Sequence, residues 1–117
     1  GGGIWIKGIS PALGKLSLLV AADDGEKMIG FAHGALKFTP EYLGNRLVGA
    51  VTHIYVLPES RNRGVARKLL MELESWFEGK GVHSIELQVA DRNKGAHKFW
   101  EACGYTTELK QLRKIAE

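Results

Sequence analysis

The stretch PESRNRGVARKLLMELE at residues 58–74 contains a leucine-rich segment. Three arginines and a glycine lie just before this segment or at its start. A purely structural helix is better started by Ser, Thr or Asp, because those side chains cap its first N–H groups. Without a cap, these N–H groups and the helix dipole attract anions. Gly64 lets the backbone approach a ligand closely, and Arg61 and Arg63 add positive charge. We therefore predict a diphosphate site at residues 61–66. A solvated basic helix end that binds nothing is the alternative.

The composition argues for a local anion site and against a nucleic-acid track. The 117 residues include 16 Lys and Arg and 13 Asp and Glu, a net charge of +3. A nucleic-acid-binding domain would carry a dense basic face with aromatic residues between the charges. Here the cations concentrate at Arg61, Arg63, Arg67 and Lys68. We expect no nucleic-acid partner and no metal.

Length and cysteine content limit the class of protein further. We expect one domain spanning residues 1–117, with residues 1–3 as a tag remnant or trimmed end. No apolar run approaches the roughly 20 residues of a membrane helix. One cysteine cannot form an internal disulfide, which favours a reducing compartment and predicts a cytoplasmic protein.

Apolar periodicity predicts an alternation of strands and helices. Two strands, 16–22 and 27–38, form a hairpin around Asp24-Gly25. A nearly uncharged strand covers 50–57, and a helix follows from Gly64 until the GKG at 79–81. A strand over 84–90 and a shorter helix closed by Gly104 come next. The tail from 105 fits a strand or a helix, and we favour a strand.

This order predicts an α/β (α+β) fold. The sheet should be mixed and mostly antiparallel, twisted, with a central parallel strand pair joined by a right-handed crossover and with flanking helices. A short strand also fits residues 4–9, but no helices fit before residue 16.

Two motifs in the right order resemble those of the GNAT superfamily, the acyl-CoA-dependent N-acetyltransferases. The stretch RNRGVA at 61–66 fits the pattern R/Q-x-x-G-x-G/A of that family's acyl-CoA loop. The second block fits N-x-x-A-x-x-F-[YW]-x-x-x-G-[FY] through Asn93, Ala96, Phe99, Trp100, Gly104 and Tyr105. The resemblance runs from about residue 16 to residue 115. It implies either a family member with a shortened N-terminal helical part or a fragment of a longer chain.

The resemblance implies where acetyl-CoA, the co-substrate, would bind. The backbone of Tyr55, Val56 and Leu57 would bond the pantetheine where this strand splays from the one at 84–90. The diphosphate would be held by the amides of Arg61, Asn62, Arg63, Gly64, Val65 and Ala66. Asn93 and Ala96 would line the far side, although Asn93 could instead serve as an N-cap.

The resemblance also implies direct transfer of the acetyl group to an amine. The stretch Ala50-Val51-Thr52-His53 has no carboxylate where the family often has its base, so we take His53 as the base. A structural histidine bonded to a neighbouring residue is the alternative. Trp100 fills the position of the family's usual tyrosine acid, which leaves Tyr55 or water as the proton donor. His33 and Glu86 are candidate substrate contacts.

The expected activity is acetyl transfer to a primary amine of a small molecule or to a protein N-terminus. Because the shortened front would leave apolar surface exposed, we predict a homodimer whose second subunit helps to complete the cleft. A catalytically inactive acyl-CoA-binding module is the alternative, and a small nucleic-acid-binding domain is a third.

Overall fold

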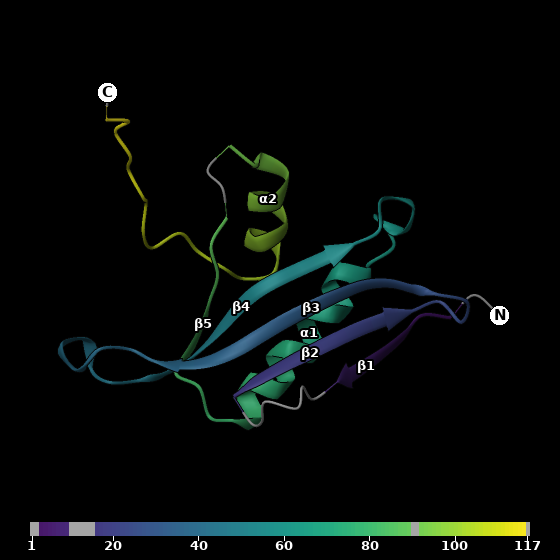
Figure 1. The fold of residues 1–117 in the computed structure, drawn as a ribbon, viewed down its shortest axis with the longest axis horizontal. Coiled ribbons are helices and arrows are strands. Elements are labelled where there is room, and N and C mark those ends of the chain that lie inside the picture. Colours follow the sequence, from purple (N-terminus) through teal and green to yellow (C-terminus); the bar gives the residue numbers. More distant parts are fainter. Residues whose placement is uncertain (1–2, 10–15, 90–91, 117) are drawn as a thin grey trace.

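The computed structural model of the protein describes residues 3–9, 16–89 and 92–116. Its elements, in chain order, are β1 (Trp5–Ile9), β2 (Ser17–Asp23), β3 (Met28–Phe38), the 3₁₀ turn η1 (Glu41–Leu43), β4 (Leu47–Val56), the 3₁₀ turn η2 (Pro58–Ser60), α1 (Val65–Gly79), β5 (Ser84–Glu86) and α2 (Lys94–Ala102). These strands form one sheet in the order β1-β2-β3-β4-β5. All neighbours are antiparallel except β4 and β5, which are parallel (Figure 1). The predicted mixed sheet with a parallel pair and flanking helices is confirmed. In the described sheet this pair lies at one edge, where a central position was expected.

The turn between β2 and β3 is held by two aspartates, as the sequence predicts. The Asp23 carboxylate accepts a hydrogen bond from the N–H of Gly25, and the Asp24 carboxylate accepts from the N–H groups of Glu26 and Lys27. These backbone donors lower the pKa of Asp24 below its usual range. Gly25 has φ 95°, a left-handed conformation that suits glycine.

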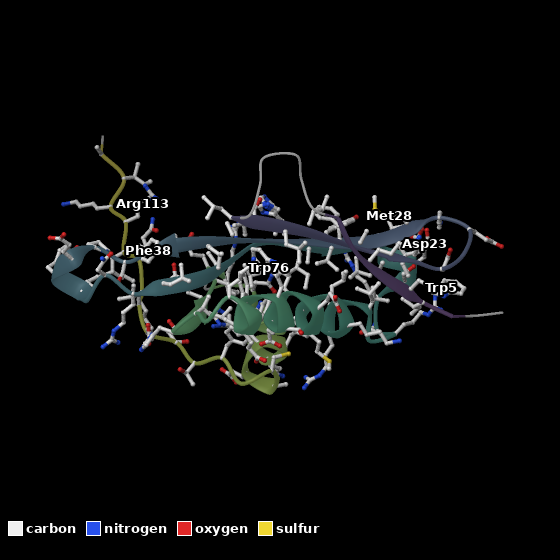
Figure 2. The ribbon with its side chains drawn as sticks, turned by 90° about the horizontal axis from the view of Figure 1, so that it is seen from below. Trp5, Asp23, Met28, Phe38, Trp76 and Arg113 are labelled. Atoms are coloured by element: carbon white, nitrogen blue, oxygen red, sulfur yellow. The ribbon has the colours of Figure 1, made fainter. Side chains whose placement is uncertain are left out.

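Helix α1 lies along one face of the sheet and forms the core with it (Figure 2). Its buried side chains recur at helical spacing, and the strands place apolar side chains opposite them. Phe77 packs directly over Gly34 of β3 and Gly49 of β4. The core residues are Val20, Ala22, Ile29, Ala32, Val51 and Val56 from the sheet, Val65, Leu69, Leu70, Leu73 and Phe77 from α1, and Trp100 from α2.

The opposite face of the sheet carries Phe31, His33, His53 and Tyr55. Phe31 lies beside Tyr55 and His33 lies beside His53, with ring centroids 6.1 and 6.3 Å apart. In the described ranges, no helix packs on this face (Figure 2). His53 and Tyr55 are exposed on this face, whereas Phe31 and His33 are half-buried.

Two predicted strands differ from the structure, whereas the short strand proposed at residues 4–9 is confirmed as β1. The strand expected over 84–90 ends at Glu86. The strand favoured for the tail is wrong, because residues 105–116 contain no helix or strand. Leu109, Leu112 and Ile115 recur every third residue, whereas one face of a strand repeats every second. β5 also offers only three residues for a further strand to pair with.

Candidate active site

A groove begins where β4 and β5 separate. Their pairing covers only Val48–Ala50 against Ser84–Glu86, and β4 then continues alone to Val56. At this point the register between β3 and β4 shifts, so that Thr52 is an extra residue between the paired Val51 and His53. Such a bulge bends and twists its strand, which carries β4 away from the chain that follows β5.

Two adjoining hollows, of about 700 and 500 Å³, make up this groove. They share five lining residues, Ile54, Tyr55, Asn93, Ala96 and Trp100, and are therefore continuous. The larger one is also lined by Phe31, Val51, Thr52, His53, Leu87, Gln88 and Val89, and the smaller one by Val56, Arg61, Ala66, Gly95 and Phe99. The groove thus connects His53 to the first turn of α1.

Backbone groups of β4 face the groove at Ile54 and Val56. The N–H of Leu57 donates to the carbonyl of Ile29 at 2.8 Å, and the carbonyl of Leu57 accepts from the N–H of Ser60. Because antiparallel pairs alternate, Tyr55 also directs its backbone groups towards β3, whereas Ile54 and Val56 direct theirs away from it. The N–H of Leu57 is thus engaged within the protein. The predicted backbone bonds of Tyr55 and Val56 to a ligand stay a prediction, to which the register adds Ile54.

The start of α1 is an uncapped helix terminus with two residues in the left-handed region. Asn62 has φ 64° and Gly64 has φ 77°. No side chain caps the helix, and a Cβ built on Gly64 would meet nothing within 4 Å. This helix start therefore has no side-chain cap, and the space beside Gly64 is open. The N–H of Arg61 is engaged elsewhere, since it donates to the carbonyl of Pro58 at 3.3 Å.

The side chain of Arg61 folds back along the groove. Its Nε donates to the carbonyl of Val56 at 3.0 Å, and its Cζ lies 5.7 Å from the centre of the Tyr55 ring. This places a guanidinium between the end of β4 and the start of α1. Arg63, two residues further along the loop, is exposed like Arg61.

His33 and His53 meet at the hydroxyl group of Thr52. Nδ1 of His33 lies 2.6 Å from Thr52 Oγ1, and Nδ1 of His53 lies 3.1 Å from the same atom. The hydroxyl also donates to the carbonyl oxygen of His33 at 3.1 Å. The structure therefore brings together the predicted base and one predicted substrate contact through a residue that the sequence did not single out.

The other predicted site residues are divided between the groove and the surface. Asn93 and Ala96 both line the groove, and Asn93 Oδ1 accepts from the N–H of Ala96 at 3.1 Å, so it is also the N-cap of α2. The Glu86 carboxylate is paired with Lys37 and does not line the groove. Trp100 is buried at the groove wall, between the rings of Phe99 and Tyr105.

The end of α2 is fixed to α1 by groups that do not ionise easily. The Tyr105 hydroxyl donates to Glu74 at 2.9 Å, and burial, reinforced by this bond, raises the pKa of Tyr105 well above its ordinary value. Burial also raises the pKa of the Cys103 thiol, although Arg67 opposes the effect. A protonated thiol is a poor nucleophile, which agrees with the absence of Cys103 from the predicted site.

Sequence reasoning missed Thr52, Ile54 and Gln88 as groove residues. For Thr52 one signal was present: the adjacent polar pair Thr52-His53 breaks the alternation expected of a regular strand. For Ile54 the signal would have required the pairing register, which a sequence does not display.

Within the described part of the chain, no three His, Cys, Asp or Glu side chains gather as metal ligands. Over the same residues, no helix is long and apolar enough to cross a membrane.

The fold and the groove together define a class of protein. In this class the two parallel strands of a mixed sheet separate at a bulge, and an uncapped helix begins at the end of the gap between them. The chain belongs to the acetyltransferase (GNAT) family, since residues 9–105 match the profile of that family. The resemblance of the two motifs is thereby confirmed.

One curated relative and two solved structures indicate how the chain compares with known proteins. The aminoglycoside N(6')-acetyltransferase type 1 of Salmonella typhimurium is 29% identical over 93 residues, which are 77% of this chain and 62% of that protein. The chain thus spans less than two thirds of this relative. The fold matches a tetramutant of the BH1408 protein of Bacillus halodurans, with TM-score 0.81, 23% identity and coverage of 88% of this chain and 68% of the other. It also matches the structure of AAC(6')-Iy in complex with a bisubstrate analogue, with TM-score 0.81, 18% identity and coverage of 97% and 99%.

Proposed function

We propose that the chain is the catalytic part of an acetyl-CoA-dependent N-acetyltransferase that acts on a primary amine. The observation that carries this proposal is the continuous groove from His53, past the free edge of β4, to the uncapped start of α1. Membership of the GNAT family supports the same activity.

The residues present fit acetyl-CoA as co-substrate. The N–H groups from Asn62 to Ala66 and the side chain of Arg63 would hold the diphosphate, since an uncapped helix start binds anions. The N–H and carbonyl of Ile54 and the N–H of Val56 would pair with the pantetheine amides as a further strand does, while the Val56 carbonyl accepts from Arg61. Asn93 and Ala96 would line the opposite wall of the groove.

His53 is proposed as the general base. In direct transfer, the neutral amine attacks the thioester carbonyl, a C–N bond forms, the C–S bond breaks and the CoA thiolate leaves. The Nε2 atom of His53 would accept the proton that the amine loses, directly or through water. Tyr55, two residues along β4 on the same face, remains the proposed proton donor for the thiolate, with water as the other source.

The acceptor is proposed to be a small-molecule amine or a protein N-terminus. A small-molecule acceptor is supported by the aminoglycoside acetyltransferase among the relatives. Of the described residues that line the groove, none is a carboxylate. A polycationic acceptor would therefore need Glu86 released from Lys37, or residues beyond this groove, to bind its remaining charges.

We also propose that the protein is a cytoplasmic homodimer, a state in which a second subunit would cover part of the exposed sheet face. Its one cysteine agrees with a reducing compartment.

The direct test is thiol release from acetyl-CoA in the presence of a panel of amines, namely polyamines, aminoglycosides and short peptides with free N-termini. We expect turnover with at least one class. The variant His53→Gln should lower kcat/KM by about 10²–10⁴-fold while the Kd of CoA stays the same. His83→Gln is the matched control, since His83 lies outside the groove.

Two results would contradict the proposal. Binding of CoA without turnover of any amine would leave an inactive acyl-CoA-binding module. No binding of CoA would remove the groove from consideration altogether.

A further inference from the structure

The hydroxyl group of Thr52 has three polar neighbours and only one proton. The neighbours are the carbonyl oxygen of His33 at 3.1 Å, Nδ1 of His33 at 2.6 Å and Nδ1 of His53 at 3.1 Å. A hydroxyl group donates one hydrogen bond and accepts up to two. All three contacts are satisfied together only if one neighbour accepts and the other two donate.

The carbonyl oxygen decides which neighbour accepts. It has no proton of its own, so a contact with Oγ1 is favourable only if the threonine hydroxyl donates to it. Each imidazole nitrogen, in contrast, can donate or accept according to its tautomer. The hydroxyl proton therefore points to the carbonyl, and both Nδ1 atoms must carry hydrogen.

We propose that Thr52 is a positioning residue that fixes His33 and His53 as Nδ1–H tautomers and leaves Nε2 of both rings unprotonated. The functional consequence rests on the proposed acetyl transfer: Nε2 of His53 is held as a free lone pair on the face that lines the groove. The opposite tautomer would turn the lone pair towards Thr52 and present an N–H to the amine.

The same bonds remain intact when the base accepts a proton. If Nε2 of His53 is protonated, its Nδ1–H still donates to Thr52, so no partner has to rotate. The ring of His33 is centred 6.3 Å from that of His53, and its own bond to Thr52 is likewise unchanged. Thr52 thus holds the His53 ring in one orientation before and after Nε2 accepts the proton.

The bulge of β4 is what makes this arrangement possible. In a regular strand, successive side chains point to opposite faces, so Thr52 and His53 could not share one face. The inserted residue breaks the alternation between Val51 and His53 and brings both polar side chains to the exposed face.

The test compares Thr52→Val, which removes the hydroxyl at nearly constant shape, with Thr52→Ser, which keeps it. Nitrogen NMR shifts of the imidazole rings report the tautomer, and the variants His33→Gln and His53→Gln assign the signals. In the unmodified chain at a pH where both rings are neutral, we expect Nδ1–H for both. Thr52→Val should shift both towards Nε2–H, and Thr52→Ser should restore Nδ1–H.

The kinetic readout is separate from the spectroscopic one. Thr52→Val should lower kcat about tenfold or more, with the Kd of CoA unchanged, and Thr52→Ser should recover most of the loss. Nε2–H tautomers in the unmodified chain would overturn the proposal, as would equal kcat in Thr52→Val. If both rings are Nδ1–H but no amine is acetylated, the positioning role stands and the proposed enzyme function fails.

Discussion

Gly64 combines a conformational requirement with an open position at the start of α1. Its φ of 77° disfavours any residue with a Cβ, while the space that a Cβ would enter is free of protein atoms. If the N–H groups from Asn62 to Ala66 bind the diphosphate, Gly64→Ala should weaken CoA binding about tenfold or more, by altering the loop and by adding a methyl group where the ligand approaches. Titration calorimetry with CoA measures the effect.

The matched control is Gly79→Ala at the other end of the same helix. A Cβ there also meets nothing, and φ is not in the left-handed region. CoA affinity should be unchanged in this variant. Equal affinity of the Gly64→Ala variant and the unmodified chain would place the diphosphate elsewhere.

Tyr105 should give the protein a stability that is lost in alkali. Burial and the bond to Glu74 raise its pKa in the folded state above the ordinary value of 10.0. Because the pKa of Tyr105 is higher in the folded than in the unfolded state, its contribution to stability is fully present at any pH below the unfolded-state pKa. This contribution is lost as the pH rises above about 10 towards the folded-state pKa. Urea unfolding at about pH 8 and about pH 11 should show a larger loss for the unmodified chain than for Tyr105→Phe.

At about pH 8 the same variant should cost about 1 kcal/mol, the usual value of one hydrogen bond. Tyr42 and Tyr55 are present in both proteins, so their titration cancels in the comparison. An equal alkaline loss in the two proteins would show that the hydroxyl of Tyr105 does not govern it.

The role of a single residue could be predicted only where its type or its neighbours in the sequence were unusual. Gly64 could be identified because a glycine between cations at a helix start is unusual, and His53 because the strand around it is otherwise nearly uncharged. The bonds of Thr52, Arg61 and Leu57 depend on strand register and on turn geometry. Those bonds exist only in three dimensions, so the sequence could not assign them.

At the scale of elements, α1 packs closely on the sheet because two strands carry glycine beneath Phe77. A Cβ on Gly34 or on Gly49 would come within 2.6 Å of the Phe77 ring. Phe77 is fully buried, so the ring has no free space to move into. Gly49→Ala should therefore destabilise the fold by about 1–3 kcal/mol through overpacking.

Chemical unfolding with urea measures this loss. The double variant Gly49→Ala/Phe77→Leu tests the cause, because a smaller side chain at 77 relieves the overlap, and the two changes should then cost less than the sum of their separate effects. Strict additivity would show that the alanine acts elsewhere in β4.

The elements that were predicted well are those whose patterns are long. The 15 residues of α1 repeat their apolar positions over several turns, and the tip of the β2–β3 hairpin has specific turn residues. β5 was predicted too long because Leu87 and Val89 continue its alternation, although the bend of β4 has already removed their pairing partner. The tail from residue 105 was predicted as a strand from its apolar residues. A strand also needs a neighbouring strand to pair with, which the sequence pattern does not reveal.

At the scale of the whole molecule, the two faces of the sheet have different roles. One face is closed by α1 and supplies the core (Figure 2). The other face carries the rings of His33, His53, Phe31 and Tyr55 beside the groove. The bulge at Thr52 joins these roles, since one inserted residue both opens the groove and brings the histidines together. The core residues and the proposed catalytic residues therefore lie on opposite faces of the sheet, and β4 contributes to both.

The exposed apolar side chains of the whole molecule argue for association with a second copy. Leu109 and Leu112 are 90% and 91% exposed, and Tyr55 beside the groove is 43% exposed. Covering such side chains contributes about 25 cal/mol per Å² of apolar surface, which favours a dimer. Sedimentation equilibrium at micromolar concentration should give twice the 12.9 kDa mass of one chain.

The double variant Leu109→Asp/Leu112→Asp should shift this equilibrium towards the monomer, because charged side chains resist burial at an interface. Lys110→Ser on the same segment leaves both leucines in place and should leave the dimer intact. If acetyl transfer falls together with the dimer population, the second copy helps to complete the acceptor side of the groove. A clean monomer of the unmodified chain at this concentration would contradict the association, and the acceptor side would then have to be formed by one chain.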